Sequence, residues 1–298
     1  MTAFTLVQVV SAEGPPELAL LLAGGTIVPA PEALAGRTML EILQEWDTCA
    51  EVLRAYDPTD AQPLIGVRLV APITYPHKVI CAGANYTDHM AEMGLPAPPG
   101  PVDPYFFLKP PTTTVIGPGA AIPMPAGTDV RLDFEAELAV VIAHRVRNVD
   151  PAKALRHVAG YSIANDVSAR GRFRRTDPLG PPFAFDWIGH KGQDGFCPLG
   201  PGLVPAWAVP DPDRLAVRTW VDDELRQDSS TAQMLVPISE QIAALSRVLT
   251  LEPGDIVLTG TPAGVGAGNG RFLGGGEEIR IEIEGVGELR NRAGPPEA

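Results

Sequence analysis

Short apolar segments separated by glycine and proline follow one another from about Val70 to the end of the chain. We expect β-strands at residues 78–83, 104–110, 137–142, 215–221, 255–260 and 278–285. The last of these alternates strictly, with isoleucine at every second position and charged residues between, which is typical of a half-buried strand. Residues 138–142 are instead apolar without a break, so this strand enters a core. The pattern predicts a chain dominated by β-structure.

Helical periodicity is confined to a few segments. An amphipathic helix is expected within residues 31–56, built around Met39, Ile42, Leu43, Trp46 and Leu53. Asp150 followed by Pro151 is typical of a helix start and predicts a helix to Gly160. Residues 237–251 also show helical spacing and are followed by Pro253-Gly254. We therefore predict a β-rich α+β fold, with a small N-terminal α+β domain over residues 1–70 and a larger domain over residues 71–298.

The composition is that of an ordinary globular protein, with 45% hydrophobic and 20% charged residues among 298. A formal net charge of −13 disfavours nucleic acid and anionic membrane surfaces as partners. The three cysteines are scattered without a CxxC pair, which favours reduced thiols and a cytoplasmic location. If the substrate is an anion, positive charge must be concentrated at its site.

The stretch LDFEAELAVVI, residues 132–142, places Asp133, Glu135 and Glu137 at alternate positions, so the three carboxylates share one face of a strand. Asp166 follows the apolar YSIA and adds a fourth acid at a strand end. Bare carboxylates beside a core are costly. Glu135, Glu137 and Asp166 would suit Mg²⁺ or Mn²⁺ and leave positions open for water or substrate.

Two other arrangements remain open for these acids. They could pair with arginines such as Arg170 or Arg131 instead of a metal. Asp133 is expected to lie beside the metal ligands or in solvent.

His89 and Glu92 in NYTDHMAEMG are three residues apart, so on a helical turn their side chains meet. A carboxylate that fixes the imidazole tautomer prepares a general base; the alternative is a surface ion pair. Three basic residues beside apolar or glycine residues, Lys109, Arg170 and Lys191, could bind an anion or form structural ion pairs. The segment RGRFRR (170–175) and the proline-rich TDPLGPPFAF after it are expected to form a mobile loop over a site, or a solvated or subunit-contacting loop.

Two familiar motifs do not apply. GVGAGNG (264–270) follows a strand, but the RFLGGG after it opens no helix, so a dinucleotide fingerprint is not supported. No G-x-S-x-G occurs, so no nucleophile elbow is predicted.

Taken in order, several motifs resemble the fumarylacetoacetate hydrolase family over roughly residues 77–292. They are GANYTDHMAEMG, FLKP, LDFEAELAVVI, GYSIANDVSAR, HKGQDGFCPLGP, DDELRQ and GDIVLTGTPAGVG. The resemblance implies a mixed β-roll fold and a homodimer. Gly171, where many members have aspartate, and Gln193, where an aromatic residue is common, depart from the pattern.

The resemblance also implies roles for individual residues. Glu135, Glu137 and Asp166 would hold Mg²⁺, Mn²⁺ or Ca²⁺, and His89 with Glu92 would activate water. Lys191 would contact the substrate oxyanion and Thr261 its carboxylate end, and Lys109 and Arg170 match further substrate-binding positions.

The expected function is hydrolysis of a carbon–carbon bond in an acylpyruvate-like 2,4-diketo acid through a metal-stabilised pyruvate enolate. The same enolate chemistry would support decarboxylation of a 2-oxo acid, or isomerisation or hydration of a 2-hydroxydienoate. A catalytically silent protein that binds a metal and a keto acid is the alternative of another class.

Overall fold

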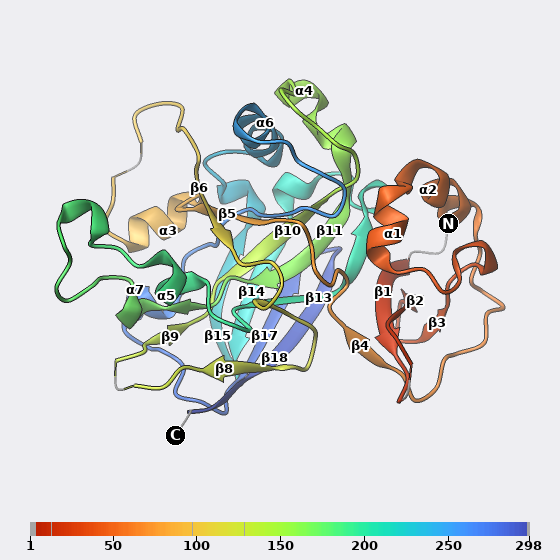
Figure 1. The fold of residues 1–298 in the computed structure, drawn as a ribbon, viewed down its shortest axis with the longest axis horizontal. Coiled ribbons are helices and arrows are strands. Elements are labelled where there is room, and N and C mark those ends of the chain that lie inside the picture. Colours follow the sequence, from red (N-terminus) through yellow and green to blue (C-terminus); the bar gives the residue numbers. More distant parts are fainter. Residues whose placement is uncertain (1–3, 13, 97, 128, 297–298) are drawn as a thin grey trace.

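The computed structural model describes residues 4–12, 14–96, 98–127 and 129–296. Figure 1 shows strands packed in layers, with short helices around them. The strands are β1 Phe4–Val10, β2 Glu17–Leu22, β3 Ile27–Pro29, β4 Arg68–Val70, β5 Val79–Gly83, β6 Tyr105–Lys109, β7 Val115–Ile116, β8 Ala121–Met124, β9 Leu132–Asp133, β10 Ala136–Ile142, β11 Val158–Asn165, β12 Ser168–Ala169, β13 Cys197–Pro205, β14 Ala216–Val221, β15 Glu224–Ser230, β16 Ile256–Leu258, β17 Glu278–Ile283 and β18 Gly287–Pro296. The helices are α1 Met39–Gln44, α2 Trp46–Ala55, α3 Thr87–Glu92, α4 Pro151–Ala154, α5 Trp187–Lys191, α6 Ile238–Val248 and α7 Gly266–Asn269.

The largest sheet runs in the order β3-β2-β1-β13-β11-β10-β16-β5-β6 and contains both parallel and antiparallel pairs. Both of its faces are covered. Along β10, Leu138 and Val140 belong to one apolar cluster, whereas Ala139 and Val141 belong to the other. This two-sided burial explains why residues 138–142 are apolar without alternation. The β-rich α+β prediction is confirmed.

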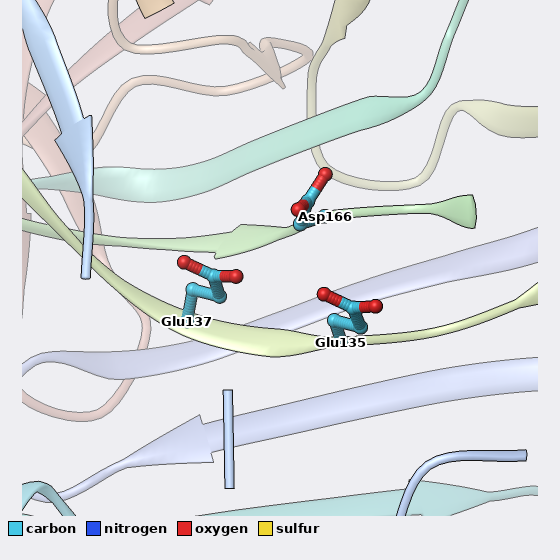
Figure 2. Close-up of side chains that lie close together, drawn as sticks. All are labelled: Glu135, Glu137 and Asp166. Atoms are coloured by element: carbon cyan, nitrogen blue, oxygen red, sulfur yellow. The ribbon is translucent and has the colours of Figure 1, made fainter. Parts of the chain in front are cut away.

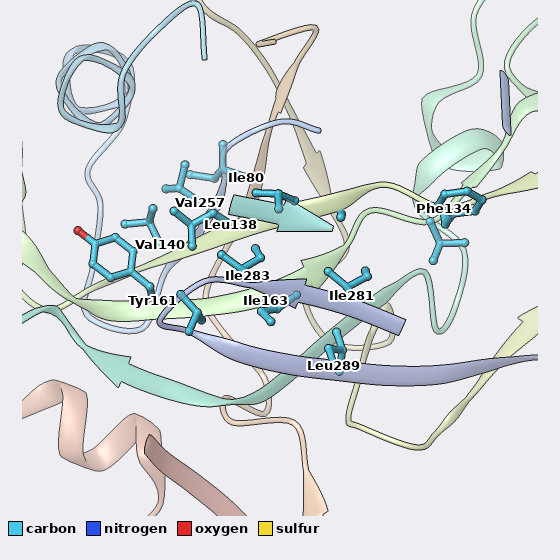
Figure 3. Packing of buried hydrophobic residues seen from close by; sticks show 14 of the residues in the cluster. Ile80, Phe134, Leu138, Val140, Tyr161, Ile163, Val257, Ile281, Ile283 and Leu289 are labelled. Carbon is cyan, nitrogen blue, oxygen red and sulfur yellow. The ribbon is translucent and has the colours of Figure 1, made fainter. Parts of the chain in front are cut away.

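A second sheet, in the order β15-β14-β17-β18-β8, packs on the cluster that contains Leu138 and Val140. Figure 3 shows Leu138, Val140 and Ile163 of the large sheet meeting Ile281 and Ile283 of β17. The alternation predicted for β17 is confirmed, because its residues are buried at every second position. All six strands predicted after Val70 are present.

The N-terminal strands continue the large sheet rather than forming a separate one. β1 pairs with β13 through Leu6 and Leu203. The apolar sides of α1 and α2 pack in the cluster that contains Ala139 and Val141. Figure 1 shows these helices at one end of the molecule, with α3, α5 and α7 at the opposite end. The boundary at residue 70 remains a prediction.

Two helix predictions need correction. The expected helix of residues 31–56 is broken at Glu45, and its apolar spacing continues through the break, so periodicity alone could not reveal it. The helix predicted to reach Gly160 ends at Ala154, and β11 begins at Val158. Here pairing with β10 and β13 in a fully buried strand outweighs local helix preference. α6 is confirmed but ends at Val248.

Among the residues that the structure describes, no helix is both long and apolar enough to cross a bilayer.

Candidate active site and metal centre

The acidic residues of LDFEAEL and NDVSAR meet where two neighbouring strands end. β10 carries Glu137, Glu135 directly precedes β10, and Asp166 directly follows β11. The two strands pair through Ala136 and Asn165, and the Asp166 N–H donates to the Glu135 carbonyl at 2.9 Å. Figure 2 shows the three carboxylates facing one another. They are buried, and one ligand oxygen from each lies within 4.8 Å of the others.

Basic side chains reach two of these three carboxylates. The Lys191 ammonium lies 2.8 Å from Glu135 Oε2 and 2.6 Å from Asp166 Oδ2. The Lys109 ammonium lies 2.6 Å from Asp166 Oδ1. Arg170 pairs with Glu135 and, at 2.9 Å, with Asp133. Arginine pairing and a metal site are therefore not exclusive alternatives, since each carboxylate oxygen can accept more than one contact.

Arg131 and Asp133, the other residues considered for this region, are not members of the triad. Arg131 pairs with the exposed Asp129. Asp133 is fully buried rather than solvated, and it accepts hydrogen bonds from the backbone N–H groups of Gly266 and Ala267.

Glu137 is the acid that lacks a basic partner among the described residues. One of its oxygens accepts a hydrogen bond from the Gly260 N–H at 2.6 Å. Burial, followed by the charges of Asp166 and Glu135, raises the pKa of Glu137 well above its ordinary value. By contrast, although burial acts to raise the pKa of Glu135, Lys191 and Arg170 hold that pKa below its usual range.

The donor set therefore fits a divalent cation. Four buried acids, with Asp133 included, face three basic side chains, so a deprotonated Glu137 would carry a negative charge that no basic side chain of the described residues pairs with. Oxygens around Mg²⁺ or Mn²⁺ at about 2.1 Å lie about 3.0 to 4.2 Å apart, which this triad reaches with at most small side-chain shifts. All-oxygen coordination is what Mg²⁺, Mn²⁺ and Ca²⁺ prefer.

His89 and Glu92 form the contact expected from their spacing on α3. His89 Nδ1 lies 2.9 Å from Glu92 Oε2, and the Gly264 N–H donates to the other Glu92 oxygen at 2.9 Å. The pair is not a surface ion pair, because His89 is only 7% exposed. His89 lies near enough to Glu135 for its charge to act on that carboxyl.

The glycine-rich stretch 264–270 has a role that the sequence alone did not reveal. Its backbone N–H groups hold Glu92, through Gly264, and Asp133, through Gly266. Gly264 has a φ of +106°, and a Cβ on Gly268 would lie 2.1 Å from Glu92 Oε1. The glycines are thus needed for backbone to approach two acids closely. A search for nucleotide motifs does not detect this use.

The other predicted site residues lie around the same centre. Lys109 is buried and also donates to the backbone carbonyls of Val167 and Lys191, at 3.1 and 2.6 Å. Thr261 directly follows Gly260, and its hydroxyl accepts a hydrogen bond from Gln227 at 2.9 Å. The structure thus brings together every residue that was expected to form the site.

The segment after Arg170 folds back on itself. A β-bridge joins Arg174 to Phe185, and Phe173 packs against Trp187. Gly171, one of the departures from the family pattern, lies where a Cβ would be 1.6 Å from the Asp129 carbonyl oxygen, so a side chain has no room there.

Comparisons with known proteins agree with this fold and centre. Residues 78–293 match the model of the fumarylacetoacetate (FAA) hydrolase C-terminal family. The chain is 38% identical over 278 residues to oxaloacetate tautomerase FAHD2B, mitochondrial, of Bos taurus, which covers 90% of this chain and 84% of that protein.

Two solved structures are similar over nearly the whole chain. The 5-carboxymethyl-2-hydroxymuconate delta-isomerase of Mycobacterium smegmatis is 35% identical, with a TM-score of 0.76 over 99% of this chain and 100% of that one. The maleylpyruvate hydrolase of Sphingobium sp. SYK-6, solved with manganese(II) and pyruvate, is 29% identical, with a TM-score of 0.77 over 98% and 100%.

This chain therefore belongs to the fumarylacetoacetate hydrolase family, as its motifs suggested. It has that family's β-rich fold and is a metal-dependent enzyme with a buried acidic centre for a divalent cation.

Proposed function

We propose that this enzyme hydrolyses a carbon–carbon bond of an acylpyruvate-like 2,4-diketo acid. The observation that carries the proposal is the buried His89–Glu92 pair beside the acidic triad. A hydrolase needs a base that activates water next to the group that polarises the substrate. The maleylpyruvate hydrolase solved with manganese(II) and pyruvate supports a keto-acid ligand for this fold.

Glu135, Glu137 and Asp166 would hold Mg²⁺ or Mn²⁺, which when bound supplies Lewis-acid polarisation of a 2-oxo acid. Glu92 occupies His89 Nδ1, so Nε2 is the nitrogen that accepts a proton from water. The hydroxide attacks the acyl carbonyl, and the bond to the methylene carbon breaks. Its electron pair stays with the pyruvate half as an enolate, which takes a proton back and leaves as pyruvate beside a carboxylic acid.

Basic and polar side chains would hold the substrate during this step. Lys191 is placed to stabilise the oxyanion that forms on attack, since its ammonium already lies at the triad. The Thr261 hydroxyl would bind the carboxylate end, with Arg170 and Lys109 adding positive charge. Together with the metal, these groups explain how a protein of net charge −13 binds an anion.

The experiment that tests this proposal is His89→Ala with acetopyruvate as substrate. The loss of turnover should be on the order of 10² to 10⁴, the usual contribution of a general base, while Mn²⁺ affinity is kept. His144→Ala is a matched control, because His144 forms an exposed pair with Asp47 at the same 2.9 Å. A His89→Ala enzyme that cleaves acetopyruvate at the parental rate would refute the base assignment.

Oxaloacetate tautomerisation is the second candidate, favoured by the similarity to FAHD2B. Tautomerisation needs a base but no attacking water, and decarboxylation of oxaloacetate or isomerisation of a 2-hydroxydienoate would use the same centre. Following the enol absorbance of oxaloacetate beside acetate release from acetopyruvate distinguishes these reactions. Chelation should abolish each of them, whereas a binding protein without activity would show none.

We also expect a homodimer, as the family resemblance implies, and analytical ultracentrifugation would measure it directly.

A further inference from the structure

His190 on α5 is a buried polar residue that the proposed mechanism does not use. It is 3% exposed, and neither ring nitrogen has a hydrogen-bond partner within the described ranges of the chain. Burial, followed by the charges of Lys191 and Arg170, lowers the pKa of His190 to about 2. The imidazole is therefore neutral at physiological pH and carries one N–H donor and one acceptor.

The His190 ring packs among aromatic side chains next to the acidic centre. It directly precedes Lys191, whose ammonium contacts Glu135 and Asp166. The ring packs against Phe173, at 4.7 Å between ring centroids, and Trp187, at 5.9 Å. Phe173 follows the short helix that begins at Arg170, the residue that pairs with Glu135. The charges of Lys191, Arg170 and Glu135 all act on the His190 ring, so the ring lies beside the acidic centre.

Packing alone does not explain a histidine at this position. Buried polar groups are nearly always hydrogen-bonded, and one without a partner destabilises the fold. A phenylalanine would fill the same aromatic surroundings without that cost. A group left unsatisfied in a folded protein requires an explanation, and a catalytic or binding role is one of them.

We propose that the His190 imidazole donates a hydrogen bond to an oxygen in the acyl half of the substrate, whose apolar part lies against Phe173 and Trp187. This inference rests on the proposed function, because it extends the same site beyond the 2-oxo acid end. That end is already provided for by the acidic triad. Because Phe173 covers the ring in this structure, ligand contact requires Phe173 to move aside.

The test compares two ligands in a His89→Ala background, where acetopyruvate should be consumed about 10² to 10⁴ times more slowly. Oxalate reproduces only the chelating end of the substrate, whereas acetopyruvate adds the acyl half. Binding of each to the Mn²⁺-loaded protein is measured by calorimetry with and without His190→Phe. The Kd of acetopyruvate should rise about tenfold, the worth of one hydrogen bond, and the Kd of oxalate by less than about twofold.

Two further variants make the result specific. His190→Asn keeps a neutral N–H and should recover part of the acetopyruvate affinity that His190→Ala loses. This pair of variants tests the same hydrogen bond if His190→Phe does not fold. His157→Phe is the control, because His157 Nδ1 also lacks a partner among the described residues. His157 directly precedes β11, whereas Asp166 directly follows it, so the two residues lie roughly 30 Å apart along the strand. His157→Phe should leave both affinities unchanged.

A second readout needs neither metal nor substrate. Since His190→Phe removes two unsatisfied nitrogens, the metal-free protein should melt about 2 °C higher. Equal acetopyruvate affinity in His190→Phe and parent, or an equal loss for oxalate, would overturn the assignment. Failure of the parent to cleave acetopyruvate would instead refute the proposed reaction and leave the binding comparison valid.

Discussion

Two stretches of this chain place acids on one face of a strand, yet their surroundings are opposite. On β17, Glu278 and Glu282 face solvent beside arginines, with Arg290 2.8 Å from Glu278. In the stretch that enters β10, Glu135 and Glu137 are buried. The first set belongs to an exposed ladder of ion pairs in which Glu278, Glu282 and Glu288 pair with Arg280 and Arg290. The second set belongs to the candidate metal centre.

The protonation of the two sets differs accordingly. At the exposed ladder, burial of Glu288 acts to raise its pKa, but the hydrogen bonds and charges of Arg290 and Arg280 together outweigh this and lower the pKa. Burial and neighbouring acids instead raise the pKa of Glu137. Acids on one face of a strand therefore have two meanings, and burial decides which of them need a bound cation in addition to the basic side chains of the protein.

The largest effect on stability is expected from removing a buried cation. Lys191→Met should destabilise the metal-free protein by about 3 to 5 kcal/mol, because it leaves Glu135 and Asp166 buried with less compensation. Arg290→Met on the exposed ladder should cost at most about 1 kcal/mol. Urea unfolding with EDTA present measures both, and similar losses would show that the buried pairs are not special.

The second effect concerns metal affinity. Glu137→Gln should weaken Mn²⁺ binding by at least about 100-fold, since even residues that only support a metal ligand contribute 10- to 100-fold. The matched variant Glu282→Gln on β17 should change it by less than about twofold. Calorimetric titration of both variants is the measurement. Unchanged affinity in Glu137→Gln would exclude this residue as a ligand.

A smaller effect is expected from pH in the absence of metal. The folded-state pKa of Glu137 lies above its ordinary value of 4.5, so the folded protein holds a proton that the unfolded chain releases. Stability from this group is complete below pH 4.5 and is lost as the pH rises through the raised pKa. The parent should therefore lose stability relative to Glu137→Gln over that range.

The exposed ladder should show the opposite sign. The pKa of Glu288 is lowered, so its contribution is present above pH 4.5 and is lost as the pH falls through the folded-state pKa. Urea unfolding of parent, Glu137→Gln and Glu288→Gln across pH, with EDTA, tests both signs. A parallel pH dependence for all three proteins would contradict them.

The smallest effect is expected at an exposed pair on β14. Arg218 lies 3.0 Å from Asp228, and both side chains are about half exposed. Arg218→Met should cost about 0.2 to 1 kcal/mol, and this difference should disappear at about 1 M salt because exposed charges are screened. A loss that persists at high salt would point to packing by the arginine stem instead.

Local patterns predicted much of this protein. Three features could be predicted because they depend on neighbours in the chain. They are the alternation of β17, the acids at the ends of β10 and β11, and the helical spacing of His89 and Glu92. The ordered motifs indicated the family and its metal centre. The alternation and the helical spacing depend on residues only a few positions apart, so the sequence by itself determined them.

Other features depended on contacts between distant segments. Residues 158–160 form a strand because β10 and β13 lie on either side of them, and this pairing outweighs the local helix signal that begins at Asp150. The glycines of 264–270 support acids from residues 92 and 133, more than a hundred positions away. His190 is buried against Phe173 and Trp187, and neither of its ring nitrogens has a partner among the described residues. Only the tertiary structure decided these, because burial and close backbone approach are set by what the fold brings together.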